Sequence, residues 1–209
     1  MARDNLKNRD NWQTESGPAG LSGQAEQSVI DVFSEAFENT DYQIIKSPKN
    51  LKHIYDNVVL PLDTQSKIYT PSEKTLTIAK ERGWGVTPDF CIMNKKTGKF
   101  LFGEIKRQDG WVEGGTQSDG RGNAHERMCK LFSPGLIKVY RSISKIEDVS
   151  ILPFWVIFMG NITRDPKRNR EIYLWFDSFQ NNYYMWRPNT DGSEMVKFFF
   201  DHLAPYLEN

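Results

Sequence analysis

Two carboxylates and an amine lie in the sequence in an order suited to phosphodiester hydrolysis. Asp89 follows a proline, and Glu104-Ile105-Lys106 begins fifteen residues later. Mg²⁺ prefers oxygen ligands, keeps several waters and completes its octahedron with substrate phosphate oxygens. We therefore predict a metal site formed by Asp89, Glu104 and the backbone carbonyl of Ile105. Lys106 would hold or deprotonate the attacking water and offset charge on the phosphate.

The residues between the two carboxylates predict a β-hairpin. Segments 87–93 (TPDFCIM) and 99–106 (KFLFGEIK) are apolar-rich runs with strand character, and the polar stretch 94–98 between them ends in a glycine that permits a turn. The pattern favours two antiparallel strands that carry the acidic residues at their outer ends.

The hairpin register brings the chemistry to one face. A turn symmetric about residues 96–97 places Asp89 opposite Glu104, with Cβ atoms about 5 Å apart. Strand alternation then puts Lys106 on the face of Glu104 and turns the Ile105 side chain into the core. The alternative is an ordinary strand after a proline turn, in which Glu104 and Lys106 form a solvated ion pair.

A glycine-rich segment follows the second strand. Residues 107–122 (RQDGWVEGGTQSDGRG) contain five glycines and no apolar periodicity, and such long loops are usually functional or disordered. Asn123 can then cap a helix, with Glu126 completing a capping-box-like pair. Arg121 and Arg127 could each make bidentate hydrogen bonds to guanine O6 and N7, and Asn123 to adenine N6 and N7. The alternative is that Asn123 and Glu126 only cap the helix, although both roles can coexist.

These motifs carry a family resemblance. The segments PDF, GEIKRQDGWVEG, GRGNAHER and CKLF-PGL, in this order and spacing, resemble the type II restriction endonucleases of the MunI and EcoRI group within the PD-(D/E)xK nuclease superfamily. The likeness on the MunI side extends to LPFWV near residue 152, GNITRDPKR at 160–168 and MWRPN at 185–189. Residues 1–20 and 61–83 match that pattern poorly.

The resemblance implies an α/β fold of the restriction-endonuclease type, with a central mixed five-stranded sheet flanked by helices. It implies Asp89 and Glu104 as metal ligands, Lys106 as the catalytic lysine and Mg²⁺ as the cofactor. The implied reaction is a double-strand cut at C^AATTG that leaves 5′-AATT ends. The implied base-recognition residues are Arg121, for the outer C·G pair, and Gly122, Asn123, Ala124, His125, Glu126 and Arg127.

The expected partners are double-stranded DNA and a second copy of the chain, because a two-fold dimer reads a palindrome and cuts both strands. Segment 124–141 is a candidate dimer interface. A DNA methyltransferase is expected in the same system, though not as a stable subunit. Segment 164–170 (RDPKRNR) is either a polar hairpin loop or a phosphate contact. The candidate phosphate contacts are Arg107, Lys130, Arg164, Lys167 and Arg168.

Two rival functions stay open: a structure-specific PD-(D/E)xK repair or junction nuclease, and a non-catalytic DNA-binding module. The chain has 27 basic and 27 acidic residues, and this balance argues against nucleic acid, because DNA-binding domains usually show a basic excess. Local clusters matter more than the total, and a metal would add positive charge at the site.

Length and composition predict a flexible N-terminal arm at 1–20 and a single domain at 21–209. The resemblance implies that this domain is of the restriction-endonuclease type. The longest apolar run, 151–160, is interrupted by a proline and is too short to cross a bilayer. We expect a location in the cytoplasm of a prokaryotic cell and no contact with membrane. Cys91 and Cys129 are too few for a disulfide scaffold and are predicted to be reduced core residues.

Hydrophobic periodicity predicts the scaffold around the hairpin. Glu26, in the first expected helix, either reaches the metal site or lies on the exposed surface. The expected elements are a helix at 24–37 capped by Ser22, a helix from Pro134 to Tyr140, strands at 151–159, 171–176 and 183–186, and a closing helix at 193–207.

Overall fold

A mixed sheet forms the centre of the molecule. The computed structural model describes residues 21–56, 58–108, 124–187 and 190–208. Within these ranges five strands form one sheet in the order β1-β2-β3-β4-β5. The first three strands are antiparallel neighbours and the last three are parallel. The strands are β1 (Tyr42–Lys46), β2 (Phe90–Asn94), β3 (Phe100–Arg107), β4 (Phe154–Met159) and β5 (Tyr183–Trp186).

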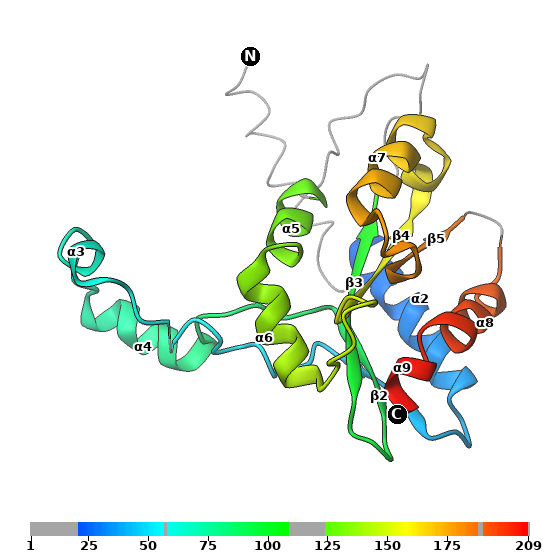
Figure 1. Ribbon diagram of the computed structural model, residues 1–209, viewed down its shortest axis with the longest axis horizontal. Coiled ribbons are helices and arrows are strands. Elements are labelled where there is room, and N and C mark those ends of the chain that lie inside the picture. The colour runs from blue at the N-terminus through cyan, green and yellow to red at the C-terminus, as the bar shows by residue number, and fades with distance from the viewer. Residues whose placement is uncertain (1–20, 57, 109–123, 188–189, 209) are drawn as a thin grey trace.

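Helices cover both faces of this sheet (Figure 1). One face packs on α2, α8 and α9 through a core that includes Phe33, Trp155 and Phe199. The other packs on α5, α6 and α7 through a core that includes Phe102 and Tyr140. The helices are α2 (Leu21–Ala36), α3 (Leu62–Gln65), α4 (Glu73–Arg82), α5 (Ala124–Leu131), α6 (Pro134–Ser144), α7 (Pro166–Phe176), α8 (Ser193–His202) and α9 (Pro205–Glu208), with 3₁₀ turns η1 (Gly160–Arg164) and η2 (Gln180–Asn182).

The predicted hairpin forms in the predicted register. Phe90 pairs with Gly103 and Met93 with Phe100, which extends outward to Asp89 beside Glu104. Asn94 begins the turn, where its side-chain oxygen accepts hydrogen bonds from the N–H groups of residues 96 and 97. Gly98 closes the turn with φ +69°, a left-handed conformation that glycine adopts without steric cost. The polar stretch therefore sets the register as the sequence indicates.

The prediction of a strand at 171–176 is wrong, because these residues form the second half of α7. Asp165 caps this helix through side-chain contacts with the N–H groups of Lys167 and Arg168, and a proline occupies its first turn. Ile172 and Phe176 are buried, four residues apart, as a helix requires. The prediction of a hairpin loop at 164–170 is also wrong, because these residues end η1 and begin α7.

Three smaller expectations also need correction. Ser22 lies inside α2 and so is not its cap. Cys129 is exposed, whereas Cys91 is buried in the core as expected. The closing helix at 193–207 is two helices, α8 and α9, which are separated at residues 203–204 before Pro205. The predictions of β5 and of the starts of α6 and α8 are confirmed. No helix among the described residues is long and apolar enough to span a membrane.

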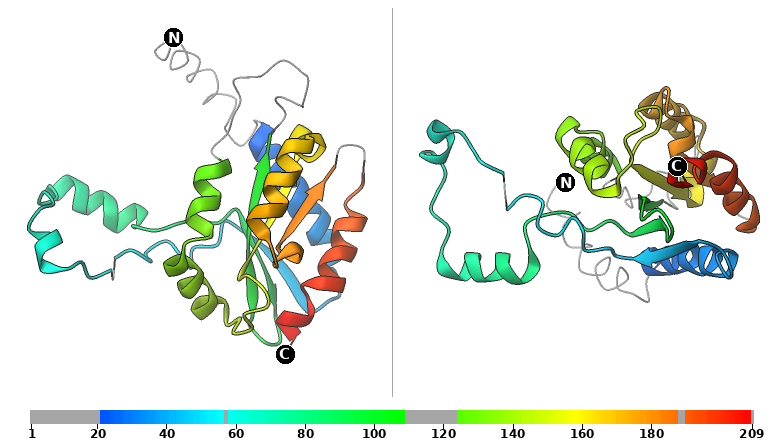
Figure 2. Two further views of the ribbon diagram at one scale, coloured as in Figure 1. Left: turned by 45° about the horizontal axis from the view of Figure 1, so that its top comes forward. Right: turned by 60° about the horizontal axis from the view of Figure 1, so that its bottom comes forward.

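A long extension at residues 52–85 leaves the body between β1 and β2 and carries α3 and α4 (Figure 2). Two chain segments meet where it begins. The Val86 N–H donates to the Leu51 carbonyl at 3.0 Å, and the Tyr55 N–H to the Trp84 carbonyl at 2.9 Å. A Cβ on Gly85 would lie 2.0 Å from the Leu51 carbonyl oxygen. Only glycine fits at this crossing, so the extension starts from a closely packed neck.

Candidate active site

Glu104 lies at the centre of a cluster of charged groups on the α5 side of β3. It is only 4% exposed. The Lys106 ammonium lies 2.7 Å from its Oε1 atom, as expected for residues two apart on a strand, while Ile105 between them turns into the opposite core. Burying a carboxylate is costly unless cations and hydrogen-bond donors surround it. The solvated-pair alternative therefore does not describe this site.

Asp89 lies beside this cluster, just beyond the end of the β2–β3 ladder. Its Oδ2 atom accepts a hydrogen bond from the Ile105 N–H at 2.7 Å. Burial and the nearby Glu104 carboxylate raise the pKa of Asp89 to about 7, against the opposing effects of the Ile105 hydrogen bond and Lys106. Two carboxylates are thus held close enough for their charges to oppose each other.

The helical Glu26 makes a further, smaller contribution. Its negative charge is among the causes that raise the pKa of Asp89, and the residue is half-buried on α2. The glutamate therefore lies near enough to influence the site, whereas a fully exposed position was the alternative.

The donor set suits a hard divalent cation. Within a strand the N–H and C=O of one residue point to the same side, so the Ile105 carbonyl faces the side on which its N–H meets Asp89. Two carboxylates and one carbonyl would then converge there, as Mg²⁺ prefers. The described residues contain no group of three or more His, Cys, Asp or Glu side chains that could hold a metal. Water and substrate phosphate would therefore complete the coordination of any Mg²⁺ at this site.

Arg127 is the unexpected member of the site. From α5 its Nη2 atom donates to Glu104 Oε2 at 2.9 Å and to the Thr87 carbonyl at 3.0 Å. Its Nε atom lies 2.8 Å from Glu104 Oε1 without hydrogen-bond alignment. Burial lowers the pKa of Arg127, but the Glu104 carboxylate outweighs that effect and the net shift is upward. The guanidinium therefore remains a cation and ties α5 to β3.

The remaining base-recognition residues are described only in part. Arg121, Gly122 and Asn123 lie outside the described residues. The backbone of residues 124–126 forms the first turn of α5, but their side chains are not among those described. A helix therefore begins where the capping pattern expects one, and Arg127 is the one expected base-contacting side chain whose position is described.

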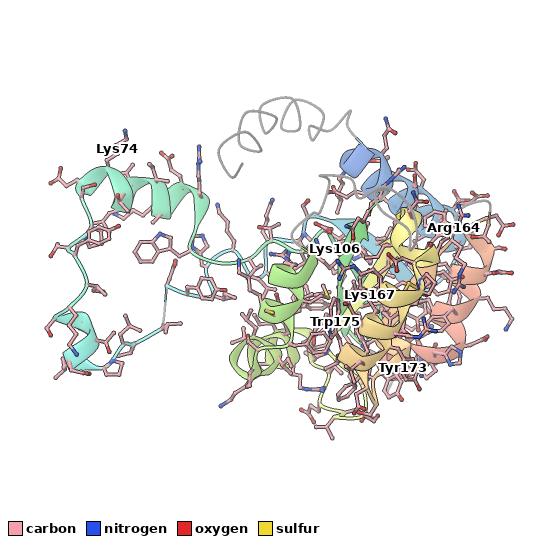
Figure 3. All side chains as sticks on the ribbon, turned by 90° about the horizontal axis from the view of Figure 1, so that it is seen from above. Lys74, Lys106, Arg164, Lys167, Tyr173 and Trp175 are labelled. Atoms are coloured by element: carbon pink, nitrogen blue, oxygen red, sulfur yellow. The ribbon has the colours of Figure 1, made fainter. Side chains whose placement is uncertain are left out.

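The candidate phosphate contacts fall into two groups. Arg107 ends β3 and Lys130 lies in the last turn of α5, and both are exposed. Arg164 and Lys167 lie on the surface of η1 and α7 (Figure 3). The Ile162 N–H donates to the Gln108 carbonyl at 3.0 Å, so η1 packs against the end of β3. Arg168 pairs with Glu171. The first group lies on β3 and α5, and the second lies on η1 and on α7, the helix that follows η1.

Sequence reasoning assigned Arg127 to a base and missed its contact with Glu104. The contact joins residues 23 positions apart in the chain and depends on how α5 packs on the sheet. One signal was available in the sequence: the apolar neighbours Phe102 and Ile105 imply that Glu104 is buried. A buried carboxylate requires cationic partners, so a further cation near Glu104 could have been predicted. Thr87, which supplies a backbone carbonyl, carried no such signal.

A five-stranded mixed sheet, with two carboxylates and a lysine at the end of its central hairpin, defines the PD-(D/E)xK class of nucleases. The family model described as Type II restriction enzyme MunI matches residues 1–208. The chain belongs to this family and is a site-specific endonuclease that cuts DNA. It is 53% identical over 208 residues to the type II restriction enzyme MunI of a Mycoplasma species, covering 100% of both chains.

A solved structure supports the same assignment. The crystal structure of MunI restriction endonuclease in complex with cognate DNA is similar to this chain with a TM-score of 0.78 and 53% sequence identity. The similarity covers 95% of this chain and 98% of that one. The α/β fold expected from the sequence is thereby confirmed, and the match of the family model over residues 1–208 includes the segments 1–20 and 61–83 that we expected to match poorly.

Proposed function

We propose that this endonuclease makes Mg²⁺-dependent double-strand cuts at C^AATTG and leaves 5′-AATT ends. The main support is the contact of Arg127 with Glu104. This contact joins the helix that we propose reads bases to the residues that we propose cut the DNA. A base-reading segment so close to the scissile phosphate fits cleavage within the recognised sequence.

Asp89, Glu104 and the Ile105 carbonyl would hold Mg²⁺ in this proposal. The bound ion would polarise the phosphate and lower the pKa of a coordinated water. Lys106 would orient the attacking water and offset negative charge that builds on phosphorus, since its Nζ atom lies within 2.7 Å of Glu104. The hydrogen bond from the Ile105 N–H keeps the Asp89 carboxylate turned toward β3, where Glu104 and Lys106 lie.

The proposed target rests on residues around the start of α5. Asn123, His125, Glu126 and Arg127 would read the inner AATT, and Arg121 the outer C·G pair. The exposed basic residues at the end of β3, on α5 and on α7 would contact phosphates and set the register on the duplex. A homodimer would bring two such sites to the two strands. A separate methyltransferase would protect the same sequence in the host.

Sequencing the ends of a cut plasmid tests target, overhang and cleavage position together. The full chain is incubated with plasmid and MgCl₂, with an EDTA arm and a Lys106→Ala arm as controls. The expected result is discrete fragments with 5′-AATT ends flanked by C and G, and no cutting in either control. Discrete cuts at another sequence would overturn the target alone. A smear or structure-dependent nicks would overturn the proposed restriction activity.

A further inference from the structure

The extension at residues 52–85 exposes an unusual amount of apolar surface. Of the fourteen large apolar side chains exposed in the described residues, ten lie in this extension. Their exposed fractions run from 37% to 88%, and the most exposed are Val59, Leu62 and Tyr69. Exposed apolar patches of this kind mark surfaces that a partner covers.

The extension is ordered locally but has no core of its own. Ser72 caps α4 by accepting a hydrogen bond from the Thr75 N–H, and Gly83 ends the helix with a positive φ of 75°. Neither α3 nor α4 contains a buried residue. A helix of 10 residues is marginal in water without packing. A surface outside this copy of the chain would supply the packing that α4 lacks.

Charge argues against DNA as the covering surface. The extension contains five Lys and Arg residues and four Asp and Glu residues, so it lacks the basic excess with which proteins neutralise phosphates. Lys74 of the extension also lies far from Lys106 of the catalytic cluster (Figure 3). An apolar surface with balanced charges is suited to a protein partner instead.

The exposed area fits a dimer. Ten apolar side chains at these exposed fractions present on the order of 1,000 Å², compared with about 800 Å² that each partner contributes to a standard interface. The extension projects on the side of the body where α5 and α6 lie (Figure 1), and these helices occupy the segment expected at the dimer interface. A second copy of this chain is therefore the partner that area and position favour.

We propose that the extension packs against a second copy of the chain, with Val59, Leu62 and Tyr69 as its principal contacts. We call this contact the clasp. This inference rests on the proposed dimeric restriction enzyme and identifies the surface that holds the dimer together. In a two-fold dimer each extension would pack on the other copy, so the contact would occur twice. The close approach of Gly83 to the Lys52 backbone and of Gly85 to the Leu51 backbone would fix the direction in which each extension leaves its own body.

A triple variant of the full chain tests the clasp. Val59→Asp, Leu62→Asp and Tyr69→Asp together place charge at positions that pack little against their own copy, so folding should be preserved. Val149→Asp is the matched control, because Val149 is 76% exposed but lies on the body. Sedimentation equilibrium without DNA should show a dimer dissociation constant raised at least ~100-fold in the triple variant. The control should match the unchanged chain.

Unchanged dimerisation in the triple variant would overturn the clasp, as would equal weakening in the control. Weaker DNA binding with unchanged dimerisation would assign the extension to DNA and also overturn it. Cross-linking an equal mixture of unlabelled and ¹⁵N-labelled chains at lysines should join Lys67 or Lys74 to the differently labelled copy. Links confined to one copy would contradict the proposal. The proposed function fails separately, if the unchanged chain yields no discrete plasmid fragments.

Discussion

Arg127 and Glu104 join α5 to β3, with the Arg127 Nη2 atom 2.9 Å from Glu104 Oε2. If the Arg127 guanidinium makes bidentate hydrogen bonds to a base, it cannot also keep all its contacts with the Glu104 carboxylate and the Thr87 carbonyl. Movement of Arg127 onto DNA would therefore release Glu104 for a cation. Base reading and metal binding would then be linked through one side chain.

Replacing Arg127 should damage folding and cutting together. Arg127→Ala leaves the buried Glu104 with Lys106 as its remaining cationic partner, so we expect a loss of about 1–3 kcal/mol in the free energy of unfolding. The single-turnover cleavage rate at saturating enzyme should fall at least ~100-fold. Lys197→Ala is the control, because Lys197 is exposed and pairs with Asp201 in its own helix, α8. Equal rates for Arg127→Ala and the unchanged chain would remove Arg127 from the site.

Specific DNA binding should depend on the charge of the carboxylate pair. Without metal, ionised Asp89 and Glu104 would repel the scissile phosphate. Since the pKa of Asp89 is about 7, we expect preference for the cognate duplex at pH 6 and its loss by pH 8, by on the order of tenfold. Asp89→Ala should keep that preference at both pH values without cutting. Gel shifts in EDTA measure it, and a pH-independent preference in the unchanged chain would contradict the repulsion.

The same carboxyl group predicts a pH-dependent stability. Its pKa is about 7 in the folded chain, against 3.8 for an ordinary aspartate. Between these values the folded state holds the extra proton, so the contribution of Asp89 is full below pH 3.8 and is lost as pH rises through 7. Asp89→Asn keeps the shape and removes the titration. Its stability relative to the unchanged chain should therefore rise by about 1–4 kcal/mol between pH 5 and pH 8.

Urea unfolding at the two pH values measures that difference. Asp201→Asn is the control, because Asp201 forms an exposed ion pair with Lys197 and such pairs contribute about 0.2–1 kcal/mol. A relative stability of Asp89→Asn that stays constant from pH 5 to pH 8 would show that Asp89 titrates as it does in the unfolded chain.

Lys106 should be needed for cutting but not for recognition. Lys106→Ala removes the ammonium beside Glu104 and leaves Arg127 as a cationic partner of that carboxylate. We expect cleavage to fall by about 10²–10⁴-fold, while the affinity for the cognate duplex changes little. A fluorescent duplex reports both, by anisotropy in Ca²⁺ and by cleavage in Mg²⁺. Cutting at an unchanged rate would show that the lysine takes no part in hydrolysis.

Gly103 should tolerate no side chain. A Cβ there would lie 2.1 Å from the Phe90 ring in the paired strand, so Gly103→Ala should lower stability by about 2–4 kcal/mol and disturb Glu104 next to it. Gly135→Ala is the control, because no atom lies within 4 Å of its added Cβ and alanine favours a helix by about 0.5–1 kcal/mol. Phe90→Leu should partly restore the Gly103→Ala chain in thermal unfolding. A stable Gly103→Ala single variant would show that the ring moves aside freely.

Local patterns predicted the β2–β3 hairpin because both of its determinants are local. Alternation assigned Glu104 and Lys106 to one face, and the polar turn fixed the register. The expected strand at 171–176 failed because six residues of mixed polarity fit a helix equally well. The Asp165-Pro166 pair that starts α7 was the better signal.

Contacts between distant segments could not be predicted in this way. The pairing of Arg127 with Glu104 depends on the packing of α5 against the sheet. The sequence patterns also gave no prediction of β1 or of α4, a helix without a buried residue. The family resemblance supplied the mixed five-stranded sheet that local residues did not.

The hairpin contains all three proposed catalytic residues, and the proposed base-reading residues follow it in the chain. Changes in the second stretch could therefore give a new target while leaving the reaction as it is. Arg127 restricts that freedom, because it belongs to the base-reading stretch and also contacts Glu104 of the hairpin. Relatives that diverge in the sequence they cut are expected to vary around residue 121 first and to keep an arginine at the position of Arg127.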